Sequence, residues 1–235
     1  MNTALWTVGL VLQFLVLVAL LRSGLARRLP FFTALIAFYL ARSAFLYVGS
    51  SLIEDDAYKV CTQVLSLIDL AFQVVVAWEL LNGGRRMGNA PIEGASRGRL
   101  AILFAVMIVV SAAVAWGLSE VSPINRFKQF DRGVILTSTL WILVAASVIF
   151  RKRELHATAA NRLLAGYFFL GAAGISGQIG RAVSASARNG HAYIAWSYVT
   201  ALVYLAVSAF WLIALTRVST RPLLKKPRKA MAGAG

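Results

Sequence analysis

Seven long apolar stretches run along the chain, separated by short segments that carry most of the charged residues. Each stretch has 18 to 24 residues, and a helix of about 20 residues crosses a hydrocarbon core about 30 Å thick. Membrane strands would need segments of about 10 residues with alternating polarity, which the stretches lack. The pattern predicts an all-α integral membrane bundle of seven transmembrane helices, at about 4–21, 30–52, 58–81, 100–118, 133–150, 163–183 and 193–216.

The composition supports a single membrane domain. Apolar residues make up 59% of the 235 residues and charged residues only 14%, whereas soluble domains average about half and about a quarter. The high hydrophobicity also excludes a disordered chain. The longest segment between spans, Asn82 to Arg99, contains five glycines and a proline, so we expect a flexible connector there. Residues 1–216 are therefore predicted as one seven-helix domain, followed by a short basic tail over 217–235.

The distribution of Lys and Arg predicts the orientation. The segments after the first, third, fifth and seventh stretches carry 17 of these residues, and the segments on the other side carry 5. By the positive-inside rule, the N-terminus lies outside and the C-terminus in the cytoplasm. We therefore expect an integral plasma-membrane protein of a bacterial inner membrane. The same rule explains the net charge of +15 without nucleic-acid binding, and the basic loops and tail are predicted to lie against anionic lipid headgroups.

Two charged residues lie near the middle of neighbouring predicted spans. Arg42 is in the second and Asp69 in the third, at matching depths, where an isolated charge is costly. We predict an Arg42–Asp69 ion pair, with either a structural role in fixing helix register or a role in binding a ligand or ion. Asp69 shares one helical stripe with Thr62, Ser66 and Gln73.

Polar stripes also occur in the sixth and seventh spans. Gln178 and Arg181 share a face with Gly174, and Tyr204 recurs with Ser197, Thr200 and Ser208. Ordinary interhelical hydrogen bonding, worth about 0.6 kcal/mol per bond, is one explanation. The other is a polar cavity between helices 2, 3, 6 and 7, lined by candidate ligand or ion-path residues: Arg42, Ser66, Asp69, Gln73, Gln178, Arg181 and Tyr204.

Other features of the spans predict packing contacts. Glycines recur every third residue in the sixth span, at 171, 174, 177 and 180, so a neighbouring backbone is expected to approach there, with a hinge as the alternative. Glu79 is at a helix C-terminus, where an acid is unfavourable, so we expect a salt bridge with Arg85, Arg86 or Arg151. Trp141 and Trp211 are deep in their spans and are expected to be packed.

The residues that most cofactor and metal sites need are scarce. The chain has one cysteine, Cys61, and two histidines, His156 and His191, which are far apart outside the predicted spans. No metal, cofactor or disulfide is predicted. An enzyme is the least supported class, because no nucleophile, base and orienting acid are visible at membrane depth.

Two functions are compatible with these features. The first is binding or transport of a small solute or proton through the polar cavity. The second is a membrane sensor or interaction module that signals to a separate protein. A second copy of the chain and a separate protein are both open as partners.

A weak internal repeat accompanies the seven spans. Spans 1 to 3 and 5 to 7 run the same way, each triplet has an arginine in its middle span, and Ala-Tyr pairs open spans 3 and 7 at 57–58 and 192–193. This resembles, in topology only, the parallel three-plus-one-plus-three plan of SWEET-type sugar transporters; coincidence is the alternative. Seven spans with an outside N-terminus also resemble microbial rhodopsins, but the last span has no lysine to attach retinal.

Overall fold

The computed structural model describes residues 3–52, 54–86, 97–120, 128–151, 159–187 and 189–219. Over these residues the chain is entirely helical and forms no strand, which confirms the all-α prediction. The elements are α1 (Thr3–Arg22), a 3-10 turn η1 (Leu25–Arg27), α2 (Pro30–Leu52), α3 (Asp55–Arg86), α4 (Arg97–Glu120), α5 (Lys128–Arg151), α6 (Ala159–Ser186) and α7 (Gly190–Ser219).

Six of the helices are long and apolar enough to cross a membrane. Within the described residues these are α1, α2, α3, α4, α6 and α7. Over the part of α5 whose side chains the structure describes, the apolar segment is shorter, Arg132–Val148. The chain is thus an all-helical, multi-pass membrane bundle with six candidate spans among its described residues, and the seventh span, predicted in α5, stays a prediction.

The helices extend beyond the apolar stretches from which they were predicted. α3 continues through Gly83 and Gly84 to Arg86, and α4 begins at Arg97. The predicted connector from Asn82 to Arg99 is therefore wrong at both ends, and its remaining residues, 87–96, lie outside the described part. Glycine costs a helix only about 1 kcal/mol relative to alanine, which does not stop a helix whose preceding turns are well packed. The predicted basic tail, apart from its first three residues in α7, also lies outside the described residues.

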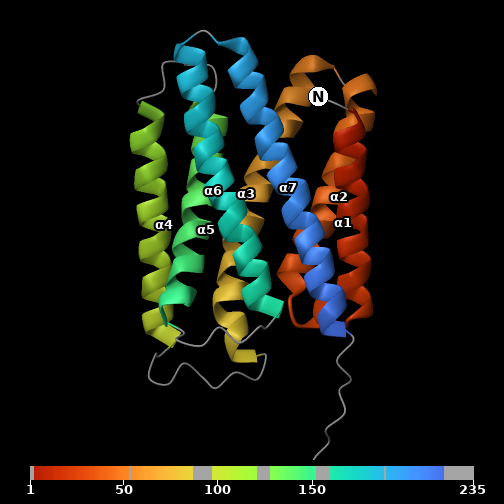
Figure 1. The fold of residues 1–235 in the computed structure, drawn as a ribbon, viewed down its shortest axis with the longest axis vertical. Helices are drawn as coiled ribbons and strands as arrows, with labels where there is room; N and C mark the ends of the chain where they lie inside the picture. Colours follow the sequence, from red (N-terminus) through yellow and green to blue (C-terminus); the bar gives the residue numbers. More distant parts are fainter. Residues whose placement is uncertain are drawn as a thin grey trace, which may run out of the picture.

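The helices form a ring with one helix outside it (Figure 1). Going around the ring, α1 packs on α2, α2 on α3, α3 on α5, α5 on α6, α6 on α7, and α7 on α1. α4 lies outside this ring and packs mainly on α5. Apart from α4, the ring therefore follows chain order, with α2 between α1 and α3 and α6 between α5 and α7.

The start of α2 is held by a side chain from α3. α2 begins with Pro30, whose missing N–H is tolerated at the first helical position. The Glu79 carboxylate accepts hydrogen bonds from the next two backbone N–H groups, those of Phe31 at 3.1 Å and Phe32 at 2.8 Å. These donors are otherwise unused, and the positive end of the helix dipole attracts the carboxylate. The sequence did not indicate this contact, and the side chains of the predicted cationic partners lie outside the described residues.

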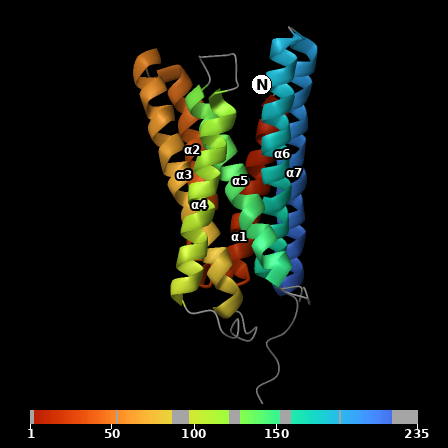
Figure 2. The same ribbon diagram turned by 90° about the vertical axis from the view of Figure 1, so that its left-hand side faces the viewer.

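The apolar core fills one half of the bundle. We call the end where α1, α3, α5 and α7 begin the upper end, as in Figure 1. Figure 2 shows α2 and α3 spreading away from α6 and α7 toward this end. The largest fully buried side chains all come from the lower half of the bundle: Val16, Leu20, Leu29, Phe32, Leu35, Val76, Leu80, Leu100, Leu140, Val144, Leu163 and Leu215. The lower half is therefore closed by close packing.

The glycines of α6 bring two neighbouring helices close. A methyl group on Gly171 would lie 2.7 Å from the backbone oxygen of Ser138 in α5, and one on Gly177 would lie 2.6 Å from the Thr200 hydroxyl in α7. Steps of three residues turn about 60° back around a helix, so a ridge of glycines passes from the α5 side to the α7 side. The predicted close packing of these glycines is confirmed, and they pack against two helices, α5 and α7, rather than against one.

Candidate functional site

The predicted Arg42–Asp69 ion pair is present and confirmed. Nη1 of Arg42 in α2 lies 3.2 Å from Oδ2 of Asp69 in α3, with side-chain exposures of 22% and 26%. Nη2 of Arg42 donates to the Ser66 hydroxyl at a longer 3.5 Å. Nε of Arg42 is buried without a partner among the described residues.

Asp69 is also held by two neutral donors. The Tyr39 hydroxyl donates to Oδ1 at 2.9 Å, and Nε2 of Gln73 donates to the same oxygen at 3.4 Å. Gln73 Nε2 also donates to the Tyr39 hydroxyl. Tyr39 lies three residues before Arg42 and Gln73 four after Asp69, so each helix supplies both of its groups from one face. The two faces together form one hydrogen-bonded cluster, and its members fix one another's rotamers.

An aromatic stack closes the lower side of this cluster. Nε1 of Trp141 in α5 donates to Oε1 of Gln73 at 2.7 Å. The Trp141 ring stacks on Tyr167 of α6, with centroids 3.6 Å apart and an interplanar angle of 9°, and Tyr167 contacts Trp211 of α7 at 4.8 Å. Trp141 and Trp211 are both buried, as predicted. The polar chain that begins at Arg42 thus ends in the packed lower core.

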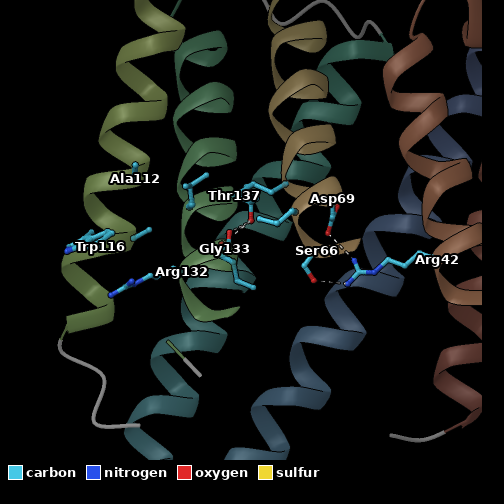
Figure 3. Close-up of a pocket in the computed structure, with 13 residues that line it drawn as sticks. Arg42, Ser66, Asp69, Ala112, Trp116, Arg132, Gly133 and Thr137 are labelled. Carbon is cyan, nitrogen blue, oxygen red and sulfur yellow. Dashed lines mark hydrogen bonds and ion pairs between the residues drawn. The ribbon is translucent and has the colours of Figure 1, made fainter. Parts of the chain in front are cut away.

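A cavity of about 390 Å³ adjoins the ion pair on its other side. Figure 3 shows Arg42 on one side of it and Arg132 on the opposite side, with Thr137 between them. The Arg132 guanidinium lies over the ring of Trp116, 4.4 Å from its centroid. We call this space the α2–α5 cavity, because α2, α3, α4 and α5 all line it, through residues that include Arg42, Ser66, Asp69, Trp116, Arg132 and Thr137.

A smaller cavity of about 100 Å³ continues below it. Gln73, Ser138 and Trp141 line this second cavity, and Thr137 lines both. Thr137 and the turn of α3 between Asp69 and Gln73 therefore separate an upper, larger space from a lower, smaller one. The lower cavity ends at Tyr167 and the aromatic stack.

The other predicted site residues lie away from the α2–α5 cavity. Gln178 is buried and Arg181 half-buried in the upper part of α6. The Tyr204 hydroxyl in α7 accepts a hydrogen bond from Gln13 of α1. α6 and α7 contribute nothing to the lining of this cavity, which we predicted between helices 2, 3, 6 and 7. These two cavities are lined by α2 to α5 and by α3, α5 and α6, and a cavity between helices 2, 3, 6 and 7 stays a prediction.

The residues that the sequence did not indicate come mostly from α5. Thr137 and Arg132 line the α2–α5 cavity, and Trp141, predicted only as a packed residue, donates to Gln73 of α3. The fifth stretch has no isolated charge or long polar stripe to mark these positions. In the sequence, nothing distinguishes Arg132 from the other cations in the segments between the spans. Tyr39 was available as a signal, since its spacing of three from Arg42 puts both on one helical face.

The donor set does not resemble a metal site. Within the described ranges, no group of three or more His, Cys, Asp and Glu side chains comes together. The chain matches no protein-family model, no curated protein and no solved structure.

Proposed function

We propose that the protein binds a small ligand in the α2–α5 cavity, with the Arg42–Asp69 pair as the polar floor of the site. The observation that carries this proposal is a charged pair near the middle of two candidate spans, adjoining a cavity of about 390 Å³. Small-molecule sites have volumes of about 300–1,000 Å³ and few polar groups among apolar walls. A pair needed only for helix register has no need of an adjoining cavity.

The orientation from the charge bias makes the upper end the outer end. In this proposal all seven helices cross the plasma membrane, with the N-terminus outside, and the ligand approaches from the outer half of the bundle. The closed lower half supports binding and sensing over continuous transport, because transport requires the packed core around Phe32, Tyr167 and Trp211 to open. A separate cytoplasmic partner then receives the signal at the basic loops.

A thermal-shift panel tests the proposal. The full chain in detergent is heated with representative sugars, amino acids, short carboxylates and amines, beside a charge-neutral double variant, Arg42→Met with Asp69→Leu. One chemical class is expected to raise the unfolding temperature of the wild-type protein and not that of the variant. No shift with any class, or equal shifts for both proteins, contradicts the proposal.

A flux measurement then separates receptor from transporter. The compound found by the panel is given in labelled form to proteoliposomes, and a pH-sensitive dye inside them reports proton entry. Binding without flux of either species supports the sensor. Flux that is lost in the double variant supports transport, and it requires the lower core to open during the cycle.

A further inference from the structure

The smaller, lower cavity lies beside α6 at a point where glycines leave space against α5. Gly171 lines this cavity, together with Ser138 of α5 and Tyr167 of α6. A methyl group on Gly174, less than one turn further along α6, would collide with the hydroxyl oxygen of Ser138. The Ser138 hydroxyl therefore points across toward α6 and not back along its own helix.

The Ser138 hydroxyl differs in this respect from other hydroxyls of the bundle. Those of Ser111 and Thr137, for example, donate to carbonyl oxygens of the preceding turn of their own helices, at 2.7 Å and 3.0 Å. The Ser138 hydroxyl makes no hydrogen bond within the described residues, and neither does the Tyr167 hydroxyl. Ser138 is 5% exposed and Tyr167 is 3% exposed. Two hydroxyl groups are thus more than nine-tenths buried without a protein partner in the described part of the chain.

Both hydroxyls nevertheless reach open space. The unpartnered polar side-chain atoms that are fully enclosed among the described residues are Gln13 Oε1, Arg42 Nε and Thr139 Oγ1. The hydroxyl oxygens of Ser138 and Tyr167 are not among them, so each keeps some accessible surface. Both residues line the lower cavity, which is therefore the space that their hydroxyls reach.

This cavity has the size and the polar groups that buried water needs. Cavities that stay dry are apolar, whereas a buried water makes two to four hydrogen bonds. Each of the two hydroxyls offers a donor and an acceptor, and Gln73 Oε1, which accepts from Trp141 at 2.7 Å, has a second lone pair. A buried hydroxyl without any partner is costly, and water in the cavity removes that cost for both.

We propose that the lower cavity binds a group of water molecules, held by the Ser138 and Tyr167 hydroxyls and by Gln73 Oε1. Its volume of about 100 Å³ accommodates about three molecules at about 30 Å³ each. These waters are a fixed part of the protein, and their binding does not depend on a ligand in the α2–α5 cavity.

The water site connects three helices. Gln73 of α3 belongs to the hydrogen-bonded cluster around Asp69. Within the described residues, no direct hydrogen bond links that cluster to α6; the contact runs through the stacked rings of Trp141 and Tyr167. Water between Gln73, Ser138 and Tyr167 therefore supplies the polar connection from the Arg42–Asp69 pair to α6.

Radiolytic labelling of the full chain in detergent, without added ligand, tests this proposal. X-rays convert bound water into hydroxyl radicals that oxidise the adjacent side chains, and mass spectrometry measures the rate at each tryptophan. Trp141 and Trp211 form a matched pair, because both are 3% exposed but only Trp141 lines the lower cavity. Trp141 is expected to be oxidised several times faster than Trp211. Equal rates would mean a dry cavity and would overturn the proposal.

A double variant, Ser138→Ala with Tyr167→Phe, locates the water. It removes both hydroxyls and adds no bulk, so the oxidation rate of Trp141 is expected to fall several-fold toward that of Trp211. The control Ser147→Ala removes a hydroxyl of the same helix that donates to the Val144 carbonyl oxygen and lines neither cavity, and it should leave the rate unchanged. If the double variant does not fold, Tyr167→Phe alone is measured, with a decrease in the rate again expected. An unchanged rate at Trp141 in a folded variant would overturn the binding of water at these hydroxyls.

Discussion

The Arg42–Asp69 pair allows a double-mutant cycle in which the two single losses are unequal. Asp69→Leu removes the acceptor for three donors and leaves the Arg42 guanidinium with only the 3.5 Å contact to Ser66. A guanidinium cannot lose its charge in a protein. Both side chains are about three-quarters buried, and breaking a pair in such a position costs about 3–5 kcal/mol. We therefore expect Asp69→Leu to lower the free energy of unfolding by about 3 kcal/mol or more.

Arg42→Met should cost less. Tyr39 and Gln73 still donate to Asp69, and a carboxyl group, unlike a guanidinium, can become neutral by taking up a proton. We expect a loss of about 2 kcal/mol, toward the lower end of the range for partly compensated charges. The double variant replaces both charges by apolar side chains and leaves only neutral donors without their acceptor, so its loss should be about 1–2 kcal/mol.

Denaturant unfolding in detergent, with size-exclusion chromatography as a check on the folded state, measures the cycle. The expected values give a coupling energy of about 3 kcal/mol. If the loss in the double variant equals the sum of the two single losses to within about 0.5 kcal/mol, the two residues are not energetically coupled, and the predicted coupling of the pair is refuted. Equal losses from the two single variants would leave the pair intact but refute the role given to Tyr39 and Gln73.

Three further predictions test the surrounding structure. Gly171→Ala should lower the unfolding temperature, because the added methyl group would meet the backbone oxygen of Ser138. Gly117→Ala, with open space around it, should be neutral or stabilising by up to about 1 kcal/mol. Equal effects of the two variants would mean that α6 does not pack closely on α5. Glu79→Ala should cost about 1–2 kcal/mol in chemical unfolding by removing the acceptor at the start of α2, and an unchanged free energy of unfolding would remove the capping role. In intact cells, an impermeant thiol reagent should label cysteines on the predicted outer side and not those on the cytoplasmic side, and the reverse pattern would overturn the orientation. The outer positions are Asp55 and Ser186, and the cytoplasmic positions are Asn89 and Ala157.

The sequence predicts the bundle because each span must satisfy its backbone internally and present apolar side chains to lipid. That requirement leaves long apolar stretches in the chain, which fix where the helices lie to within a few residues. It says little about helix ends, and α3 continues through Gly83 and Gly84 because nothing in the apolar pattern measures how well the preceding turns pack.

The candidate site was predictable only where a charge reveals it. Arg42 and Asp69 stand out because lipid cannot accommodate either alone, and depth matching then pairs them. Which other helices lie beside α2 and α3 depends on how all the helices pack around the ring. The polar stripe of a single helix does not carry that information. Gln178, Arg181 and Tyr204 lie outside the α2–α5 cavity and their role in a ligand site stays a prediction, while Arg132 and Thr137 of α5 line this cavity without having been predicted.

The most direct test of the central claim is whether the middle of the bundle is accessible beside the Arg42–Asp69 pair. Thr137 lines both cavities near the middle of α5, and Val109 is 67% exposed near the middle of α4. In a Cys61→Ser background, Thr137→Cys is expected to react with a small anionic methanethiosulfonate in reconstituted protein, and Val109→Cys is expected not to react, because lipid excludes the charged reagent. Equal inertness of both cysteines in folded protein would contradict an accessible site and leave the pair a sealed structural contact.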